Sequence, residues 1–313
     1  MRPDPTAKGA TMQAEFFCLS MSPALDATVT LPDWPSDGVV FKDVAEAVNV
    51  GGKGLNVARW LALRGANASC GGLLGADNSA PFEQELAKYG IADAFLRVPG
   101  ETRRNEMITT PRGSFKLNRP AFPSLDAAFD PMQALGRATA PHASKGVAIL
   151  SGSLPPAIAK DFYARAVGHF KSLGWITVLD SSGEAMRLGL EAKPDVIKPN
   201  AEECEPLVGF TPKTPQEFMR ATDILHAAAK HVIISDGGSG AWFDGAFAAA
   251  PKVDVVDTTA AGDTLLAEFC WRTFGVGTPD HDAARWAVAA GSAACTMPGG
   301  APPPLPLVES LTS

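Results

Sequence analysis

The chain has 313 residues, 46% of them hydrophobic and 19% charged, which is enough apolar material for one large domain or two small ones. Its formal net charge of −7 argues against nucleic acid as the main partner, because binding a phosphate backbone needs a basic face. No C-x-x-C pair occurs, which argues against a disulfide framework or a zinc knuckle and fits a reducing cytoplasm; the cysteines are Cys18, Cys70, Cys204, Cys270 and Cys295.

Residues 1–13 are predicted to form a disordered tail, and residues 14–313 one large folded domain with a minor appendage. The opening "MRPDPTAKGATM" lacks the apolar stretch of a signal peptide. No apolar run approaches the roughly 18 residues of a membrane span. We therefore expect a cytoplasmic protein that contacts neither membrane nor nucleic acid.

The first half of the chain predicts short strands separated by turns, in "VVFKDVAEAVNV" and "FLRVPGETRRNEMITTPRGSFKLN". Between them, "KGLNVARWLALRG" reads as a helix that buries Leu55, Ala58, Leu61 and Ala62. The two β segments can form a small sheet outside the main layer, a lid over about 27–50 and 96–120. An ordinary extension of the main sheet is the alternative.

From residue 146 onward, strands alternate with helices, which predicts a mostly parallel sheet covered on both faces. Ligands of such sheets lie beyond the carboxyl ends of the strands. The small polar segments expected at that edge are 151–153, 180–182, 198–200 and 235–238. The Pro-rich end, "MPGGAPPPLPLVESLTS", is expected to run over the surface, since residues 302–304 cannot continue a helix.

Two glycine-rich or small-residue turns each lead into a helix. "NVGGKGLNVA" lets the backbone approach a ligand and opens a helix whose N–H groups attract anions; a turn needed only for chain geometry is the alternative. In "DTTAAGDTLLAEF", the N–H groups of residues 260–263 would line a small concavity for an oxyanion. Asp263, in the first helical turn, is expected to be ionised and able to accept a proton, unless it merely caps the helix.

These segments resemble one known family. "NVGGKGLNVARWLALRGANASCGGLLGADN" and "DTTAAGDTLLAEF" are similar to the two signatures of the PfkB family of carbohydrate kinases, over about residues 16–300. "SPALD", "TRRN", "LSGSLPP", "LDSSGEA" and "KPNAEE" resemble its branch of 1-phosphofructokinases and tagatose-6-phosphate kinases. The resemblance implies an α/β ribokinase-like fold of three α/β/α layers, with a mostly parallel central sheet and a small β-sheet lid.

The resemblance also implies roles for single residues. The family moves the γ-phosphate of ATP to a sugar hydroxyl, so Asp263 would be the base, and the main chain of Ala260, Ala261 and Gly262 would hold the transferred charge. Lys53 and Arg103 would clamp the phosphate that the sugar already carries. Arg103 is favoured over Arg104 because, in a strand over 102–108, it would share a face with Asn105. An exposed arginine pair without a ligand is the alternative. The residues expected to bind the sugar phosphate are Asp26, Gly51, Gly52, Lys53, Asn56, Arg103 and Asn105.

On the nucleotide side, Asn200 and Glu203 match the family motif N-x-x-E, which organises Mg²⁺ with the ATP phosphates, largely through water. The same spacing is that of a capping box, and both interpretations can hold. A glycine turn at 235–240 would follow the nucleotide, unless it is a plain hairpin turn. The residues expected to bind ATP are Lys198, Asn200, Ser235, Gly237, Gly240 and Thr258.

Two positions depart from the family pattern: Ala260 stands where Gly is usual, and Ser22 where Asn is usual. A left-handed φ at Ala260 would cost roughly 1–2 kcal/mol.

The expected function is ATP-dependent phosphorylation of a ketohexose monophosphate to a bisphosphate, with fructose 1-phosphate as first choice and tagatose 6-phosphate as second. The alternatives are a kinase for an unphosphorylated sugar or nucleoside, and a catalytically silent sugar-phosphate sensor. Mg²⁺ and ATP are the expected cofactor and co-substrate, and a homodimer through the lid the expected assembly.

Overall fold

The computed structural model describes residues 14–42, 44–122, 125–126, 128–140 and 145–312. The predicted tail, 1–13, lies outside these residues. Within them, the strands form one nine-stranded and one four-stranded sheet. The large sheet has the order β13-β12-β11-β10-β9-β8-β1-β4-β5, and every pair from β11 to β5 is parallel. Its strands are β1 (Glu15–Ser20), β4 (Asn67–Gly75), β5 (Ala92–Val98), β8 (Gly146–Ser151), β9 (Ile176–Asp180), β10 (Val196–Ile197), β11 (His231–Ser235), β12 (Gly240–Phe243) and β13 (Ala246–Ala249).

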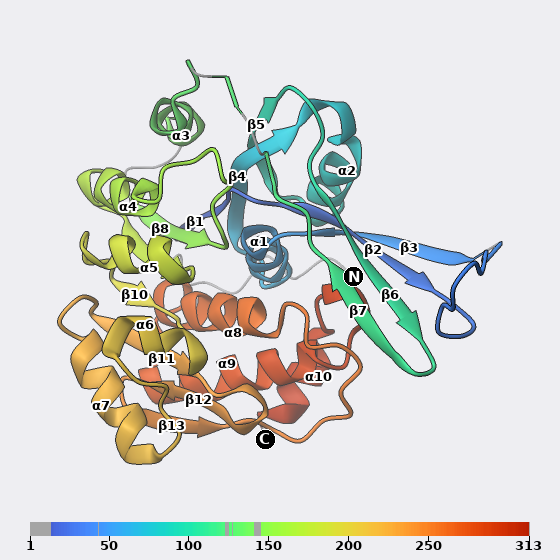
Figure 1. The fold of residues 1–313 in the computed structure, drawn as a ribbon. Coiled ribbons are helices and arrows are strands. Elements are labelled where there is room, and N and C mark those ends of the chain that lie inside the picture. Colours follow the sequence, from blue (N-terminus) through green and yellow to red (C-terminus); the bar gives the residue numbers. More distant parts are fainter. Residues whose placement is uncertain (1–13, 43, 123–124, 127, 141–144, 313) are drawn as a thin grey trace, which may run out of the picture.

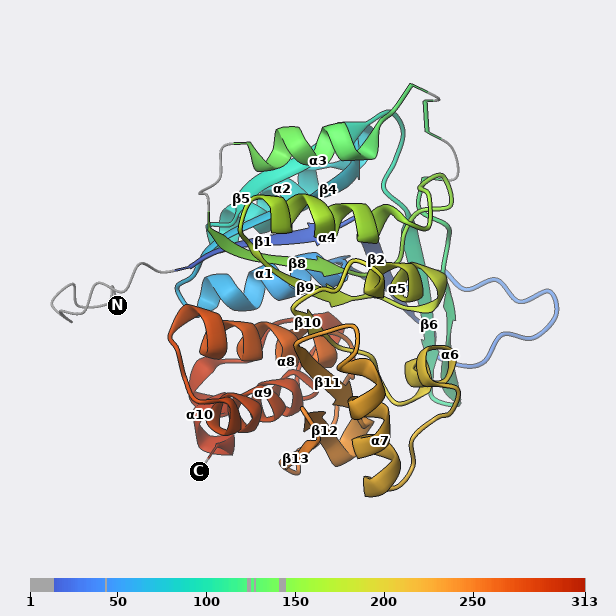
Figure 2. The same cartoon turned by 90° about the vertical axis from the view of Figure 1, so that its left-hand side faces the viewer.

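Helices cover both faces of this sheet, as Figures 1 and 2 show. Successive side chains of β1 alternate between two cores: Phe16 and Cys18 pack on one face, Phe17 and Leu19 on the other. The first face carries α1 (Lys53–Leu63), α2 (Ala80–Tyr89), α8 (Ala261–Cys270), α9 (Asp280–Ala294) and α10 (Leu305–Leu311). The second carries α3 (Pro131–Thr139), α4 (Phe162–Ser172), α5 (Gly183–Leu190), α6 (Glu205–Val208) and α7 (Pro215–Leu225). The three-layer architecture is therefore confirmed.

The smaller sheet projects from one side of the molecule (Figure 1). Its order is β3-β2-β6-β7, with a parallel pair between β2 and β6. The strands are β2 (Ala24–Thr30), β3 (Ala45–Gly51), β6 (Arg104–Thr110) and β7 (Gly113–Leu117). It is a separate sheet rather than an extension of the main one. Residues 96–98, which the predicted lid included, end β5 at the edge of the large sheet instead.

Two expectations about helices are modified by the structure. In α1, Leu55, Ala58 and Leu61 are buried as predicted, whereas Ala62 is only half-buried. The Pro-rich C-terminal segment is not merely a surface run, because α10 begins directly after Pro304 and buries Val308. Proline cannot continue a helix but is tolerated at its start. No helix in the described part of the chain combines the length and apolar character needed to cross a bilayer.

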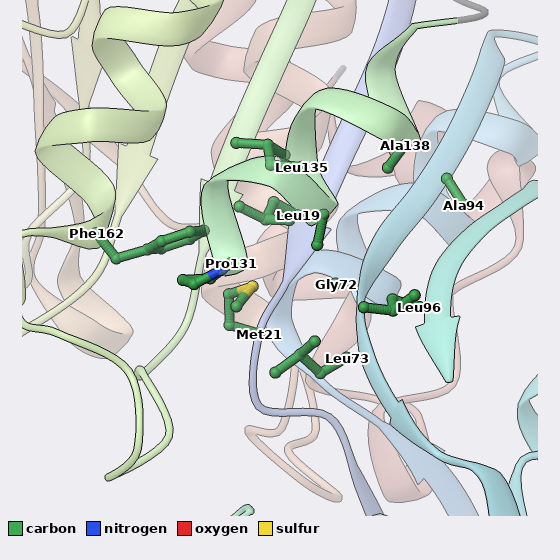
Figure 3. A pocket seen from close by; sticks show the side chains of 11 residues that line it. Leu19, Met21, Gly72, Leu73, Ala94, Leu96, Pro131, Leu135, Ala138 and Phe162 are labelled. Atoms are coloured by element: carbon green, nitrogen blue, oxygen red, sulfur yellow. The ribbon is translucent and has the colours of Figure 1, made fainter. Parts of the chain in front are cut away.

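An apolar recess lies between α3 and the sheet, as Figure 3 shows. Leu135 and Ala138 of α3 face Leu19, Leu73 and Leu96 across it. The recess is lined almost wholly by hydrocarbon, so it offers no group that could bind or activate a phosphate. The chemistry must lie elsewhere, at the carboxyl edge of the strands.

Candidate active site

Asp180, the last residue of β9, lies between two lysines at the carboxyl edge of the large sheet. Its Oδ1 is 3.1 Å from Nζ of Lys53 and 3.3 Å from Nζ of Lys198, and its side chain is fully buried. Burial alone would raise the pKa of Asp180, but Lys198 and Lys53 outweigh it and hold that pKa below its ordinary value. The buried Oδ2 of Asp180 has no hydrogen-bond partner among the residues that the structure describes. The arrangement presents two fixed cations and one unused carboxylate oxygen.

Asp263, the predicted base, lies in the first turn of α8 and is 6% exposed. Nδ2 of Asn56 donates to its Oδ2 at 2.7 Å. Burial raises the pKa of Asp263 above its ordinary value, and the positive charge of Lys53 opposes that rise. Lys53 and Asn56 both lie in the first turn of α1. Because Asn56 contacts Asp263, this turn also brings Lys53 close to Asp263. A carboxylate with a raised pKa is a better proton acceptor than an exposed one.

In the turn before α8, Ala260 has the left-handed conformation whose cost was considered from the sequence. Ala260 has φ 64° and ψ 3°, close to the values of the third residue of a type II turn, where Gly is usual. The N–H of Ala261 closes this turn on the carbonyl of Thr258 at 3.3 Å. Of the four N–H groups expected to line the anion site, that of Ala261 is therefore engaged within the turn. Lys198 borders the same turn, since a β-carbon on Gly262 would lie 3.4 Å from its Nζ.

The carboxylate of Asp257 stabilises this turn through hydrogen bonds. Its Oδ1 accepts hydrogen bonds from the N–H and the hydroxyl of Thr259 at 2.9 and 2.7 Å. Its Oδ2 accepts from the N–H of Gly299 at 3.0 Å. The hydrogen bonds to Thr259 and Gly299 outweigh burial and lower the pKa of Asp257. The small-residue turn is thus tied to a loop 42 residues further on.

Asp26 and Asn105, both of which were expected to bind the sugar phosphate, lie next to each other in the small sheet. They are direct neighbours on β2 and β6, and Nδ2 of Asn105 donates to Oδ1 of Asp26 at 2.8 Å. Both line a cleft of about 600 Å³, part of it open to solvent, between the small sheet and residues 257–259. Gly51 leaves room for Asp26, since a β-carbon there would meet its carboxylate. Gly52 has φ 138° and packs against Pro23, so chain geometry also accounts for this glycine.

The two candidate arginines have different partners. Arg103 precedes β6 and donates to the carbonyls of Ser22, Pro23 and Arg119 at 3.0–3.3 Å. Arg104 of β6 forms an ion pair with Glu46 of β3, across the intervening strand β2. The pairing with Glu46 argues against a role of Arg104 in the cleft. Arg103 is held by backbone carbonyls and has no ion pair with a carboxylate of the described residues.

On the nucleotide side, Asn200 and Glu203 form the predicted capping box. The N–H of Glu203 donates to Oδ1 of Asn200 at 2.8 Å, and the N–H of Asn200 donates to Oε2 of Glu203 at 2.9 Å. Ser235 pairs with Asn200 as an isolated parallel bridge, so these two predicted nucleotide segments lie side by side. Gly240 is explained by the hairpin, because a β-carbon there would lie 2.1 Å from the carbonyl oxygen of Ala248. Gly237 has φ 51° in the turn before it.

Three further residues of the site were not singled out from the sequence: Asp180, Asp257 and Arg59. A carboxylate that ends a buried strand, as in "ITVLDSS", was the available signal for Asp180. For Asp257, the signal was an Asp placed two residues before Thr259, the spacing of an Asx turn. Arg59 gave no signal, because an arginine on a helix is ordinarily exposed.

The protein has three α/β/α layers and a separate small sheet. A buried acid, Asp263, lies in the first turn of a helix near two lysines. These features together are those of a ribokinase-like sugar kinase. The chain belongs to the pfkB family of carbohydrate kinases, whose model matches residues 28–307.

Its relatives include the 1-phosphofructokinases of Rhodobacter capsulatus, 34% identical over 80% of both chains, and of Vibrio cholerae, 33% identical over 83% of both. The 1-phosphofructokinase of Haloferax volcanii is 31% identical over 91% of this chain and 92% of its own. Among solved structures, phosphofructokinase-2 from Escherichia coli in complex with potassium superposes with a TM-score of 0.86 at 24% identity, covering 96% of this chain and 98% of that one. Ribokinase from Arabidopsis thaliana superposes at 0.78 and 22% identity, over 96% and 99% of the two chains. These two confirm the fold.

Proposed function

We propose that this chain transfers the γ-phosphoryl group of ATP to the free primary hydroxyl of fructose 1-phosphate, giving fructose 1,6-bisphosphate and ADP. The bond between the γ-phosphorus and its bridging oxygen breaks, the sugar oxygen bonds to that phosphorus, and the hydroxyl proton passes to Asp263. The observation that carries this proposal is the burial of Asp263 at the start of α8, with Asn56 on one of its oxygens and Lys53 nearby.

The surrounding residues have roles that suit phosphoryl transfer, which depends on positioning and charge stabilisation. Lys198 and the turn from Ala260 to Gly262 would face the charge of the transferred group. Asp26 and Asn105 would bind sugar hydroxyls in the cleft. Gly51, Gly52 and Asn56 would complete the sugar site beside it. Lys53 and Arg103 would hold the phosphate of the sugar.

Magnesium fits this donor set, because it prefers oxygen ligands and usually keeps several waters. The unpaired Oδ2 of Asp180 and the Glu203 oxygen outside the capping box are such donors. Asp180 and Glu203 both raise the pKa of Lys53 by their charge, against the lowering by burial, so the two acids lie around the same lysine. Asn200 and Glu203 would hold the ion through water, and the ion would neutralise phosphate charge. No cluster of three or more His, Cys, Asp or Glu side chains suited to a metal occurs among the described residues.

The outer face of the small sheet supports a homodimer. The row that contains Asp26 and Asn105 is polar and lines the cleft, whereas Val48, Phe115 and Leu117 lie on the opposite face and are 45%, 37% and 49% exposed. The same face also carries the ion pair of Arg104 and Glu46. Exposed apolar side chains beside such a pair suit burial against a second copy. Among the solved neighbours, phosphofructokinase-2 from Escherichia coli has a tetrameric inhibited form.

The test is an assay of ADP release with Mg-ATP and a substrate panel. Fructose 1-phosphate should give the highest kcat/KM, ahead of tagatose 6-phosphate and far ahead of fructose, ribose and adenosine. Asp263→Asn should lower kcat by roughly 10²–10⁴-fold with little change in KM. Preference for an unphosphorylated acceptor would support the alternative kinase, and sugar-phosphate binding without ADP release would support a sensor.

A further inference from the structure

Arg59 connects the catalytic carboxylate to the rest of the fold through Asn56. It lies one turn after Asn56 on α1 and is 5% exposed. Its Nη2 donates to Oδ1 of Asn56 at 2.7 Å, and Nδ2 of the same amide donates to Asp263 at 2.7 Å. Guanidinium, amide and carboxylate therefore form one chain of short hydrogen bonds, and the two ends of the amide have different partners.

The chemistry of arginine decides which way this amide points. A guanidinium has only donors, so the Asn56 atom that faces Arg59 must be the carbonyl oxygen. The NH₂ group is then turned toward Asp263, where it can donate. A flipped amide would bring two oxygens together at Asp263 and two donor groups together at Arg59. Asn56 alone has no such preference, because its two ends have nearly the same shape.

Arg59 is itself held in place by partners outside the site. Its Nη2 also donates to the carbonyl of Val50 on β3 at 2.7 Å, and its Nη1 forms an ion pair with Glu85 of α2 at 3.1 Å. These contacts fix the guanidinium against the base of the small sheet. A polar pocket of about 820 Å³, part of it open to solvent and lined also by Glu85 and Lys88, borders Arg59.

We propose that Arg59 is a positioning residue for the base: it holds the amide of Asn56 in the one orientation that donates to Asp263 and thereby keeps that carboxylate in one position. The inference rests on the proposed role of Asp263 in phosphoryl transfer.

Asp263 is surrounded by charges from several elements. Lys53 of α1, Asp180 at the end of β9 and Lys198 after β10 all act on it, and Arg59 adds a positive charge behind Asn56. Burial raises the pKa of Asp263, whereas the hydrogen bond from Asn56 lowers it. Without Arg59 that hydrogen bond is no longer enforced, so the pKa of Asp263 must rise further. The acidic limb of the kcat profile then moves to higher pH.

The experiment compares Arg59→Met, Arg59→Lys and Arg59→Ala with the native enzyme, using fructose 1-phosphate and Mg-ATP across a range of pH. Arg59→Met should lower kcat roughly ten- to a hundredfold, the scale of a misplaced catalytic group, and shift the acidic limb upward. Arg59→Lys keeps a donor and should recover part of both effects. Guanidinium chloride far below denaturing concentrations should raise the kcat of Arg59→Ala, since the adjoining pocket admits the ion, whereas sodium chloride at equal ionic strength should not.

Arg64→Lys is the matched control. Arg64 caps the C-terminal end of the same helix and pairs with a buried carboxylate, Glu268, but it belongs to a different hydrogen-bonded cluster. It should lose stability while keeping the native acidic limb. An Arg59→Met enzyme with the native pH profile, and with kcat reduced only in proportion to its folded fraction, would overturn the proposal. An active Asp263→Asn enzyme would instead overturn the proposed base, whatever Arg59 does.

Discussion

A β-carbon on Gly51 would lie 2.0 Å from Oδ2 of Asp26, so the carboxylate of Asp26 occupies the place of the missing side chain at position 51. The carboxylate of Asp26 can therefore lie here only because residue 51 has no side chain. Gly51 has no unusual φ, and alanine could adopt its backbone conformation.

Gly51→Ala is therefore expected to displace Asp26 while leaving the strand intact. Loss of a charge-assisted hydrogen bond to a sugar hydroxyl should raise KM for fructose 1-phosphate by about tenfold or more. Steady-state kinetics at saturating ATP measures this. Gly136→Ala on α3 is the control, because a β-carbon there meets nothing within 4 Å. It should leave KM unchanged and stabilise the helix by about 0.5–1 kcal/mol. A native KM in Gly51→Ala would show that Asp26 does not bind the sugar.

Ala260→Gly should make the protein more stable. The left-handed φ of Ala260 costs its methyl group roughly 1–2 kcal/mol, partly offset by the greater freedom of glycine in the unfolded chain. The expected net gain in the free energy of unfolding is about 1 kcal/mol, measured by urea titration. Ala261→Gly changes a residue with ordinary helical geometry and should instead lose up to about 1 kcal/mol. Shifts of the same sign in both variants would contradict the argument.

The sequence was sufficient for the parts of the fold that depend on local pattern. Alternating strands and helices after residue 146 predicted the parallel sheet and the edge where Asp180 and Lys198 meet. The alanine at position 260, where glycine is usual, also raised the possibility of a left-handed φ, which the structure has. These features can be predicted because periodicity, turns and strand ends depend on residues that are close together in the sequence.

The rest depended on contacts between distant segments, which no local pattern reveals. Residues 96–98 looked like part of the small sheet, but β5 pairs with β4 at the edge of the large one. Arg103 is anchored by backbone carbonyls, one of them 81 residues earlier, and no local pattern indicates these partners. The orientation of Asn56 requires knowing that Arg59 is buried, and burial of an arginine is decided only by tertiary packing.

Glu268 on α8 is the centre of a buried ionic cluster that joins α8 to α1. It is 0% exposed and accepts from Nε1 of Trp60 and Nε of Arg64, both at 2.8 Å, and from Nε of Arg272 at 2.9 Å. Removing the charge leaves two arginines without their counter-ion in a poorly solvated place. Glu268→Gln should therefore cost about 3–5 kcal/mol in the free energy of unfolding.

An exposed pair provides the comparison for this cluster. Glu191 and Arg187 form an (i, i+4) ion pair in which both side chains are more than half exposed. Glu191→Gln should cost no more than about 0.5 kcal/mol, because water screens the pair. Urea titrations of both variants measure the difference. Equal losses would mean that burial of Glu268 carries no special weight.

Leu117→Glu should weaken the proposed dimer, because it replaces an exposed apolar side chain on the outer face of the small sheet with a charged one. Size-exclusion chromatography with light scattering should show the native chain as a dimer and the variant as a monomer at the same concentration. Lys116→Gln, one residue earlier and lining the cleft, should stay dimeric. A native chain that is monomeric throughout would rule out the lid dimer.

The pair of His231 and Asp244 should make the protein less stable as the pH rises. Nδ1 of His231 lies 2.9 Å from Oδ2 of Asp244, and this hydrogen bond raises the pKa of His231 above its ordinary value. The stabilisation is thus complete below the unfolded pKa, about 6.5, and is lost as pH rises through the folded value. Its size is at most about 1 kcal/mol, because the pair is partly solvated. His231→Asn should remove this fall, which begins above about pH 6.5.

His169 is the control of opposite sign. Burial lowers the pKa of His169, so the unfolded chain binds the proton more readily than the folded chain does. The contribution of His169 to stability therefore rises with pH. Urea titrations across the range should therefore give slopes that change in opposite directions for His231→Asn and His169→Asn, and changes in the same direction would refute the assignment.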